Sequence, residues 1–346
     1  MNSRKATISL KYNRASVSGL IAPYLASFQY KDVASGSSDS ISLELFDRDC
    51  RWIGKWFPQK GDLLQPTIQT VNWIGEGQQL SFPCGAFRVD DFSFTGGPLK
   101  LNMEAVAVPA DNSGFKATNR TTTYEATTLK EIGQTITKRA GISLFFEAVD
   151  ISVEKVEQSN QNDCAFYTDL VEKFGLAVKI YNDKVVVFSE ADYEDKEPKA
   201  ILTPADFEPA WSWNTEVTGT YTGVKYQYTN SDKNKTFTVT AGGGSRILTV
   251  NEPADNLTEA TAIALAAVNN ANKSTTAMSI TMMARPGLIA SDCVQISGLK
   301  RLDGKYYIEQ ITHSLGGGYK MSLKLRKVEQ RISEATSISS AVSEGG

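Results

Sequence analysis

One β-hairpin motif occurs twice in the sequence, and this repeat constrains the fold more than any other feature. Residues 85–97 and 304–316 align at a constant offset of 219 residues, and their apolar and acidic positions coincide. The matched pairs are Gly85 with Gly304, Phe87 with Tyr306, Val89 with Ile308, Asp90 with Glu309, Phe92 with Ile311 and, upstream, Asp62 with Asp292. Such a match indicates a duplicated β unit, with coincidence between two hairpins as the alternative.

The second strand of each hairpin matches as well, once one extra turn residue moves the offset to 220. Residues 99–105 then align with residues 319–325. In both copies the apolar residues change parity, after Val89 and after Ile308. Because successive side chains of a strand point to opposite faces, this slip predicts a β-bulge or a barrel corner at the same place in each copy.

Apolar patterning divides the 346 residues into three structured segments and a tail. Residues 1–112 alternate as β structure and carry no net charge. Residues 113–198 mix helices with short strands, and their 10 basic and 15 acidic residues give −5. Residues 199–330 return to β structure, with one inserted helix and a net charge of +3, whereas residues 331–346 are rich in Ser, Ala and Gly. We expect that tail to be flexible, or ordered only by a partner.

These segments predict a β-rich α+β fold, in which two similar β-barrel-like domains flank a small α/β middle domain. The helices of the middle segment have recognisable ends. Thr128 to Glu131 fits a capping box and Gly141 follows the last turn, while Asn162 or Asp163 caps the second helix.

Residue counts restrict catalysis and metal binding. The chain has one histidine, His313, and the repeat puts it in the position of Phe94, which favours a half-buried strand residue over a general base. Its four cysteines are scattered without a CxxC pair, so no structural zinc or iron–sulfur site is expected. A net charge of −3 argues against a basic nucleic-acid-binding face. We expect no catalytic residues, no metal and no cofactor.

Three further stretches are weak signals. Residues 298–306 look briefly like a phosphate-binding loop, but they have five residues between the glycines and Tyr306 where Ser or Thr must reach magnesium. Asp90 and Asp91 are a possible carboxylate pair, yet neighbouring strand residues diverge. The acidic run at residues 190–197 is either a metal or partner site or a solvated loop.

The N-terminus has no signal peptide pattern, and the longest apolar stretch, residues 262–268, is too short for a membrane span. We therefore expect synthesis in the cytoplasm. A loop at residues 47–57 is rich in aromatic and charged residues, and Trp52, Trp56 and Phe57 are candidates for a contact with another subunit or with a tube. Packing of this loop on its own domain is the equal alternative.

Several short stretches, taken in order, resemble the late-control D proteins, the tail-hub proteins of contractile phages and related injection particles. The resemblance covers about residues 5–328 and rests on the order and spacing of the pieces, since no single piece is specific. The stretches are residues 40–49, 56–62, 83–91, 127–132 and 158–163, followed by the hairpin that begins at Gly304.

The resemblance implies a function as well as a fold. Family hubs have two similar β-barrel domains with an α/β portion between them, and three chains form a ring whose six barrels face a six-fold tail tube while its three-fold symmetry suits the spike. The ring lines the channel through which DNA or cargo leaves, without sequence-specific binding. The expected partners are two further copies of the chain, tail tube or tube-initiator proteins and other baseplate proteins. A separate spike is also expected, since we expect no spike or lytic domain after Val328.

The resemblance thus predicts a structural hub in the baseplate of a virion or phage-like particle, and not an enzyme. Two other functions remain open. One is a peptidoglycan hydrolase that acts during penetration of the cell wall. The other is a carbohydrate- or receptor-binding tail protein that uses tryptophans such as Trp211 and Trp213.

Overall fold

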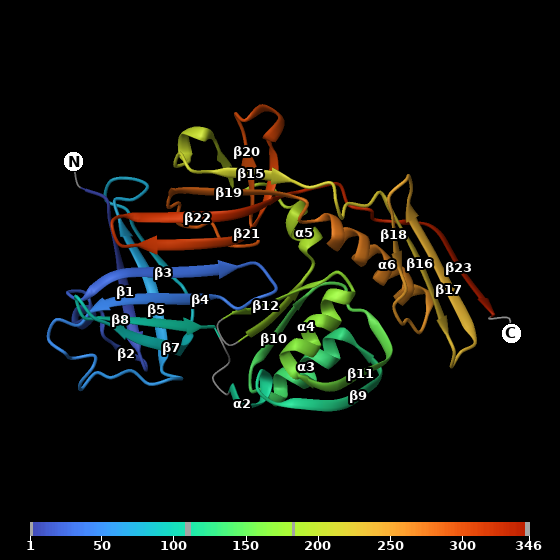
Figure 1. The fold of residues 1–346 in the computed structure, drawn as a ribbon, viewed down its shortest axis with the longest axis horizontal. Helices are drawn as coiled ribbons and strands as arrows, with labels where there is room; N and C mark the ends of the chain where they lie inside the picture. The colour runs from blue at the N-terminus through green and yellow to red at the C-terminus, as the bar shows by residue number, and fades with distance from the viewer. Residues whose placement is uncertain (1–2, 108–111, 182–183, 343–346) are drawn as a thin grey trace.

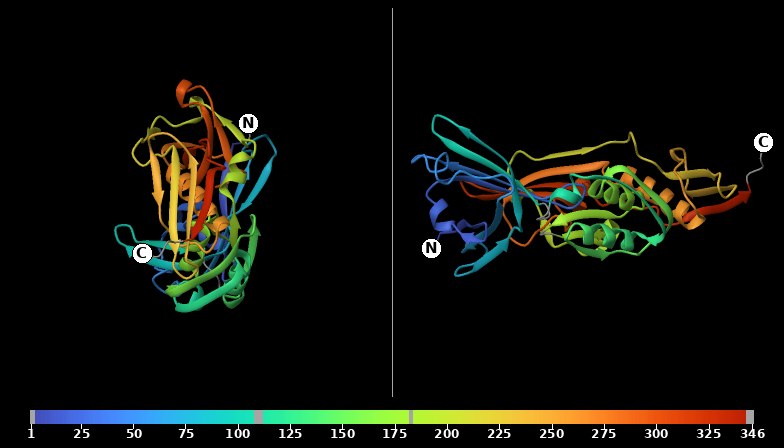
Figure 2. Two further views of the ribbon diagram at one scale, coloured as in Figure 1. Left: turned by 90° about the vertical axis from the view of Figure 1, so that its right-hand side faces the viewer. Right: turned by 90° about the horizontal axis from the view of Figure 1, so that it is seen from below.

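The computed structural model describes residues 3–107, 112–181 and 184–342. The molecule is elongated, with a large sheet at one end and a small four-stranded sheet at the other, and two helices cover a three-stranded sheet between them (Figures 1 and 2). None of the helices in these residues is long and apolar enough to cross a membrane.

The large sheet has 14 strands, and it draws them from both ends of the sequence. Its main path runs β15-β19-β22-β21-β3-β4-β8-β7-β5-β1-β2. Off this path, β6 pairs with β5, β20 pairs with β21, and β14 pairs with β20. The strands from the first segment are β1 (Lys5–Tyr12), β2 (Ala15–Ser16), β3 (Leu25–Val33), β4 (Ser40–Phe46), β5 (Leu63–Val71), β6 (Gln79–Pro83), β7 (Phe87–Thr95) and β8 (Lys100–Val106). Those from the third segment are β14 (Ala200–Leu202), β15 (Ser212–Thr215), β19 (Thr276–Met283), β20 (Cys293–Ile296), β21 (Gly304–Leu315) and β22 (Tyr319–Lys327).

The two copies of the repeat have the same strand order, β5-β7-β8-β4-β3 in the first and β20-β21-β22-β19-β15 in the second. The register of β7 on β8 shifts between Val89 and Asp91, and that of β21 on β22 shifts between Ile308 and Gln310. These positions are 219 residues apart, so the bulge predicted from the change of parity is confirmed in both copies.

Backbone hydrogen bonds around the bulge also repeat. Val89 N–H donates to the carbonyl of Asp62 and Ile308 N–H donates to the carbonyl of Asp292, each over 2.9 Å. The strand before each hairpin therefore pairs in the same way, as the match between Asp62 and Asp292 predicted. The side chains of both copies share one hydrophobic core, to which Phe87 and Tyr306 contribute equivalent, fully buried rings.

The middle segment folds as α/β structure around a second core. Helices α3 (Leu129–Arg139) and α4 (Asp163–Lys173) pack near the three-stranded sheet β10-β13-β12 and the antiparallel two-stranded sheet β9–β11 (Figure 1). Thr128 and Asn162 accept the capping hydrogen bonds of the two helices, as predicted. The remaining bounds are α1 (Ser18–Ile21), α2 (Asn112–Phe115), β9 (Asn119–Thr128), β10 (Ser143–Glu147), β11 (Ser152–Asn162), β12 (Ala177–Tyr181), β13 (Lys184–Phe188) and α5 (Glu190–Asp195).

The third segment is divided between two sheets. Its β16 (Gly223–Asn230), β17 (Lys235–Gly242) and β18 (Ile247–Val250) form a separate sheet, and α6 (Leu257–Asn272) joins them to the core of the α/β region. Two short 3-10 turns, Pro204–Asp206 and Lys300–Leu302, lie beside the large sheet. The expected β unit at residues 199–330 thus contributes strands to the large sheet and a sheet plus helix to the α/β region.

The tail differs from the expectation of a flexible segment. Residues Ala335–Val342 form β23, which pairs antiparallel with β17 and completes the order β18-β16-β17-β23. No core pattern is present in this segment because the side chains of Thr336 to Ala341 are exposed. Backbone hydrogen bonds to the edge of β17 order this strand, and they require no apolar side chains.

The acidic run at residues 190–197 is neither a solvated loop nor a metal site. It forms α5, and its Glu190 and Glu194 are buried against Arg326 of β22, which is 2% exposed. Lys273 lies 3.0 Å from Glu190, and Arg331 lies 2.7 Å from Glu194. These ion pairs join α5 to the large sheet and to the C-terminal half of the chain.

Candidate functional site: a polar sheet face and its aromatic edge

One face of the large sheet is polar, and the opposite face forms the core. Along β4, β8, β19 and β22, nearly every second residue is buried and the residues between them are accessible. The accessible positions on the central strands are mostly polar: Gln29, Lys31, Ser42, Glu44, Lys100, Asn102, Glu104, Ser279, Thr281, Thr312, Ser314, Lys320, Ser322 and Lys324. We call this set the polar face.

Side chains of the polar face bind one another across neighbouring strands. Lys100 Nζ lies 2.7 Å from Glu44 Oε1, and Thr281 and Ser322 share a hydrogen bond of 2.9 Å. The hydrogen bond from Lys100 lowers the pKa of the Glu44 carboxyl below its ordinary value. The face is thus a hydrated surface that carries both charge signs, rather than a catalytic centre.

The aromatic loop between β4 and β5 lies at the edge of the first copy. Trp52 is 6% exposed and belongs to the core, and its backbone N–H and that of Ile53 donate to the buried carboxylate of Asp47 over 3.0 Å each. Trp56 packs edge-to-face on Trp52 at 5.3 Å between centroids. For Trp52, therefore, the structure shows packing on its own unit.

Phe57 is the exposed member of the three candidate residues. Its side chain is 52% exposed, and its ring contacts Phe94 at 5.8 Å and Phe92 at 5.4 Å between centroids. Phe92 and Phe94 are half-buried residues of β7. The aromatic loop and this end of β7 therefore form one apolar edge, and contact of Trp52, Trp56 and Phe57 with another chain stays a prediction.

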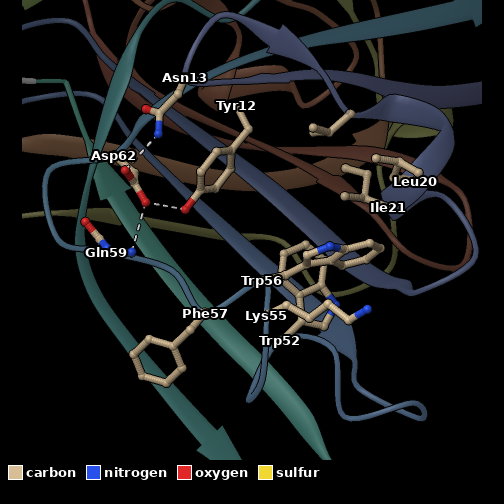
Figure 3. A pocket seen from close by; sticks show the side chains of 11 residues that line it. Tyr12, Asn13, Leu20, Ile21, Trp52, Lys55, Trp56, Phe57, Gln59 and Asp62 are labelled. Atoms are coloured by element: carbon tan, nitrogen blue, oxygen red, sulfur yellow. Dashed lines mark hydrogen bonds between the residues drawn. The ribbon is translucent and has the colours of Figure 1, made fainter.

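A cleft of about 380 Å³ opens between this loop and the start of the chain (Figure 3). Its one acid, Asp62, accepts hydrogen bonds from Tyr12 Oη, from Asn13 Nδ2 over 2.8 Å and from the backbone N–H of Gln59 over 2.9 Å. Burial acts to raise the pKa of Asp62, but the hydrogen bonds outweigh it and the pKa is lowered. Asp62 is thus an ionised anchor for the loop, unsuited to act as a general acid.

His313 lies on a strand, as its match to Phe94 suggested, but it is fully buried in the core and not half-buried. It is 1% exposed, its ring stacks on Tyr30 at 5.6 Å, and its Nδ1 lies 2.9 Å from Tyr319 Oη. Burial lowers its pKa from 6.5 to about 4. A neutral imidazole without access to solvent cannot exchange protons with a substrate.

The other weak motifs also receive structural explanations. Residues Lys300–Leu302 form a 3-10 turn that leads into β21 and not into a phosphate-binding helix. Asp90 is the unpaired residue of the bulge in β7, and it is exposed together with Asp91. Within residues 3–107, 112–181 and 184–342, no group of three or more His, Cys, Asp or Glu side chains is arranged to hold a metal ion.

Sequence reasoning missed the polar face and the role of Arg326. The signal for the face was present, because residues 319–326 alternate strictly between apolar and polar side chains. Arg326 breaks that alternation, since it occupies a polar position and is nevertheless buried. A buried arginine requires carboxylate partners, and the sequence does not indicate that these come from α5.

Comparison with known proteins agrees with these features. A probable baseplate hub protein of Escherichia phage 186 is 23% identical over 376 aligned positions, which cover 92% of this chain and 93% of the phage protein. A probable baseplate hub protein of Escherichia phage P2 is 26% identical over 63% of this chain and 55% of its own length. No family model matches the sequence.

A solved structure shares the fold. The tail protein from Neisseria meningitidis MC58 superposes with a TM-score of 0.68 over 93% of this chain and 96% of its own, at 12% sequence identity. The resemblance to tail-hub proteins that the sequence indicated is therefore confirmed, and this β-rich chain has the fold of a tail protein and is similar over most of its length to probable baseplate hub proteins.

Proposed function

We propose that the protein is the structural hub of a baseplate, in a contractile phage tail or a phage-like injection particle. In this role three chains form a ring that joins a six-fold tail tube to a three-fold spike. The similarity to probable baseplate hub proteins over 92% of the chain is the observation that carries the proposal. The fold shared with the tail protein from Neisseria meningitidis MC58 supports it.

The internal duplication supports the symmetry of this ring. Each chain supplies two copies of the β unit, with the same strand order and the same bulge. Three chains therefore supply six similar units, which match a six-fold tube, while the ring as a whole repeats three times. Oligomers with closed rotational symmetry are the common solution for such assemblies.

The polar face is the surface that would line the channel. It extends over both copies, from β4 and β8 to β22 and β19, and it has few apolar side chains to which DNA or protein cargo could adhere. Residues Lys31, Lys320 and Lys324 alternate with serine, threonine and glutamate. Such a mixed surface allows a charged polymer to pass without strong or sequence-specific binding.

A structural role needs no catalytic group, and the side chains best placed for catalysis are occupied elsewhere. His313 is stacked in the core, and Asp62 anchors the aromatic loop. Two further chains, tail tube proteins, other baseplate proteins and a separate spike are the partners in this proposal. The particle made in a bacterial host is the proposed location.

Imaging of assembled particles tests the function. A small tag fused at the C-terminus should appear at the junction between tube and spike, at three positions around the axis. A tag elsewhere in the particle, or six positions around the axis, would contradict the proposal.

Two assays test the alternative functions. Clearing of a peptidoglycan gel by the pure chain, lost on His313→Ala or on substitution of a carboxylate, would favour the hydrolase alternative. Binding to glycans by the isolated chain would favour a receptor-binding role.

A further inference from the structure

Several strand edges of the large sheet have no partner among the described residues, and two of them lie at opposite ends of the repeated unit, one in each copy. The second half of β7, Phe92–Thr95, pairs with β8 on one side, while β5 pairs only with Phe87 and Arg88 of the first half. At the far end of the sheet, β15 pairs with β19 and ends the strand order. The residues at both edges are exposed or half-exposed.

The second copy of the repeat shows what such an edge can bind. Beyond its bulge, β21 turns away from β20 and pairs antiparallel with β3 of the first copy. In this junction His313 lies opposite Tyr30, and their rings stack at an interplanar angle of 10°. The N–H of Ala34 donates to the carbonyl of Glu309 over 2.9 Å, which fixes the alternation of the hydrogen bonds along the junction.

The strand equivalent to β3 in the second copy is β15. In the first copy Tyr30 pairs with Ile41 of β4, and Ile41 pairs with Ala105 of β8. In the second copy Trp213 pairs with Met278 of β19, and Met278 pairs with Leu325 of β22. Since Leu325 matches Ala105 in the repeat, Trp213 occupies the position of Tyr30.

We propose that β7 of one chain pairs with β15 of a second copy of this chain, in the register that β21 and β3 use inside the chain. The repeat then places Phe94 opposite Trp213 and Ser93 opposite Asn214. This inference rests on the proposed ring, and it specifies how the ring closes. Three such junctions between chains alternate with the three β21–β3 junctions within chains.

The two edges fit one another chemically. Phe94 and Trp213 are half-buried on the core side of the sheet, which is the side on which His313 and Tyr30 are fully buried at the internal junction. Phe57, which is 52% exposed beside Phe94, and Trp211, which is 36% exposed beside β15, become covered by such pairing. Exposed apolar rings on open strand edges are the usual place where a strand of another chain is added.

The backbone N–H and C=O groups needed for this pairing point outward from both edges. The N–H of Glu216 donates to the carbonyl of Thr275, so the alternate residues Thr215 and Trp213 direct their N–H and C=O groups away from β19. By its match to His313, Phe94 directs its own groups away from β8. The pairing is short, because continuation of the register would bring Asp91 opposite Glu216, and two facing carboxylates repel.

Cysteine cross-linking tests the register. Ser93 and Asn214 are exposed and would form a pair without mutual backbone hydrogen bonds, in which Cα atoms are about 4.5 Å apart. The variants S93C and N214C are made separately in full-length chains that carry Cys50→Ser, because Cys50 is the exposed native cysteine. Mixed and oxidised, they should form a two-chain disulfide product. The doubly substituted chain should give a series that ends at three chains.

A matched pair controls for chance encounters. S93C mixed with S212C places the thiols two residues out of register, so its yield should be at least about tenfold lower, because a disulfide requires Cβ atoms about 4 Å apart. An equal or greater yield from this control would overturn the proposed register. The cross-links are measured on the purified chain and on assembled particles, and no cross-link in either would overturn the junction.

The cross-linking and imaging results together distinguish a failure of the β7–β15 junction from a failure of the proposed hub function. Particles with the tag at the tube–spike junction and three copies per ring, but without the Ser93–Asn214 cross-link, would leave the hub role in place and refute the β7–β15 junction. Particles without the tag at that junction would refute the hub role itself. An in-register cross-link that closes at three chains supports both.

Discussion

The two copies of the repeated hairpin share a backbone and differ in what surrounds them. In the second copy, β21 pairs with β3, and Ile311 and His313 are buried at 0% and 1% exposure. In the first copy, the equivalent Phe92 and Phe94 are half-exposed at an open edge. In each copy, the first strand of the hairpin leaves the preceding strand at the bulge. The two copies therefore differ in what pairs with the strand beyond the bulge, and not in the hairpin itself. The comparison teaches that folding completes one junction, whereas the other edge has no partner within the described residues and is completed by assembly only in our proposal.

The largest expected effect is on the free energy of unfolding, and it concerns a residue that differs between the two copies. Arg326 matches Val106 in the repeat, and it is buried against Glu190 and Glu194. Arg326→Met leaves two buried carboxylates without their common cation, and we expect a loss of about 4 kcal/mol in the free energy of unfolding. Urea unfolding measures it. The control Lys324→Met, at an exposed position of the same strand, should change stability by less than about 0.5 kcal/mol. Equal losses would mean that Arg326 does not hold α5.

The next effect compares the equivalent positions directly. Ile311→Ala empties a fully buried site and should cost about 3 kcal/mol. Phe92→Ala at the open edge should cost only about 1 kcal/mol in dilute solution, because its ring is already half-exposed. Thermal unfolding at low protein concentration measures both. A loss from Phe92→Ala as large as that from Ile311→Ala would show that the edge is covered within the single chain.

A third effect is a pH dependence present only in the second copy, which has His313 where the first has Phe94. Burial lowers the pKa of His313 from 6.5 to about 4, so between these values the unfolded chain binds a proton that the folded chain does not. The contribution of His313 to the free energy of unfolding is complete above pH 6.5. As the pH decreases from 7 to 5, this contribution decreases by about 2 kcal/mol. His313→Phe should remove that loss.

The difference between the wild-type chain and His313→Phe is the quantity to follow. Burial raises the pKa of Asp39 to about 6, so that group favours the folded chain at low pH and loses its contribution as pH rises from 3.8 to 6. This opposite term is present in both chains and cancels in the comparison. A constant difference between pH 7 and pH 5 would contradict the burial of His313.

The smallest effect concerns β23, the strand that pairs with β17 at the far end of the molecule. A chain that ends at Ser333 loses this strand but no buried side chain of residues 336–341, so we expect a loss of about 1 kcal/mol. Backbone N–H groups of β17 that face β23 should exchange hydrogen faster, while those of β16 should not change. Faster exchange throughout the four-stranded sheet would show that β23 is essential to it.

Much of the fold could be predicted from the residues. The match of Val89 with Ile308 located the bulge, because a change of parity has few structural causes. Thr128 and Asn162 marked the helix starts through local hydrogen bonding. These signals are short-range, and they depend only on neighbouring residues.

Long-range choices could not be predicted in the same way. The apolar face of α6 shows that the helix is buried, but not that it joins the α/β core instead of the second β unit. Likewise, Glu190 and Glu194 in an acidic run look solvated until Arg326 is brought to them by the fold. At the candidate site, Trp52, Trp56 and Phe57 looked alike in the sequence, and only the packing around Asp47 distinguishes the buried Trp52 from the exposed Phe57.

The alternation of the large sheet has a consequence for how such a protein can adapt. In β22, Met321 and Leu323 are fixed by the core, while Lys320, Ser322 and Lys324 between them are exposed and free of it. Substitution at the exposed positions changes the charge of the polar face with little effect on stability. Natural variation, or deliberate redesign, can therefore adjust the charge of the polar face one residue at a time while the core beneath it remains the same.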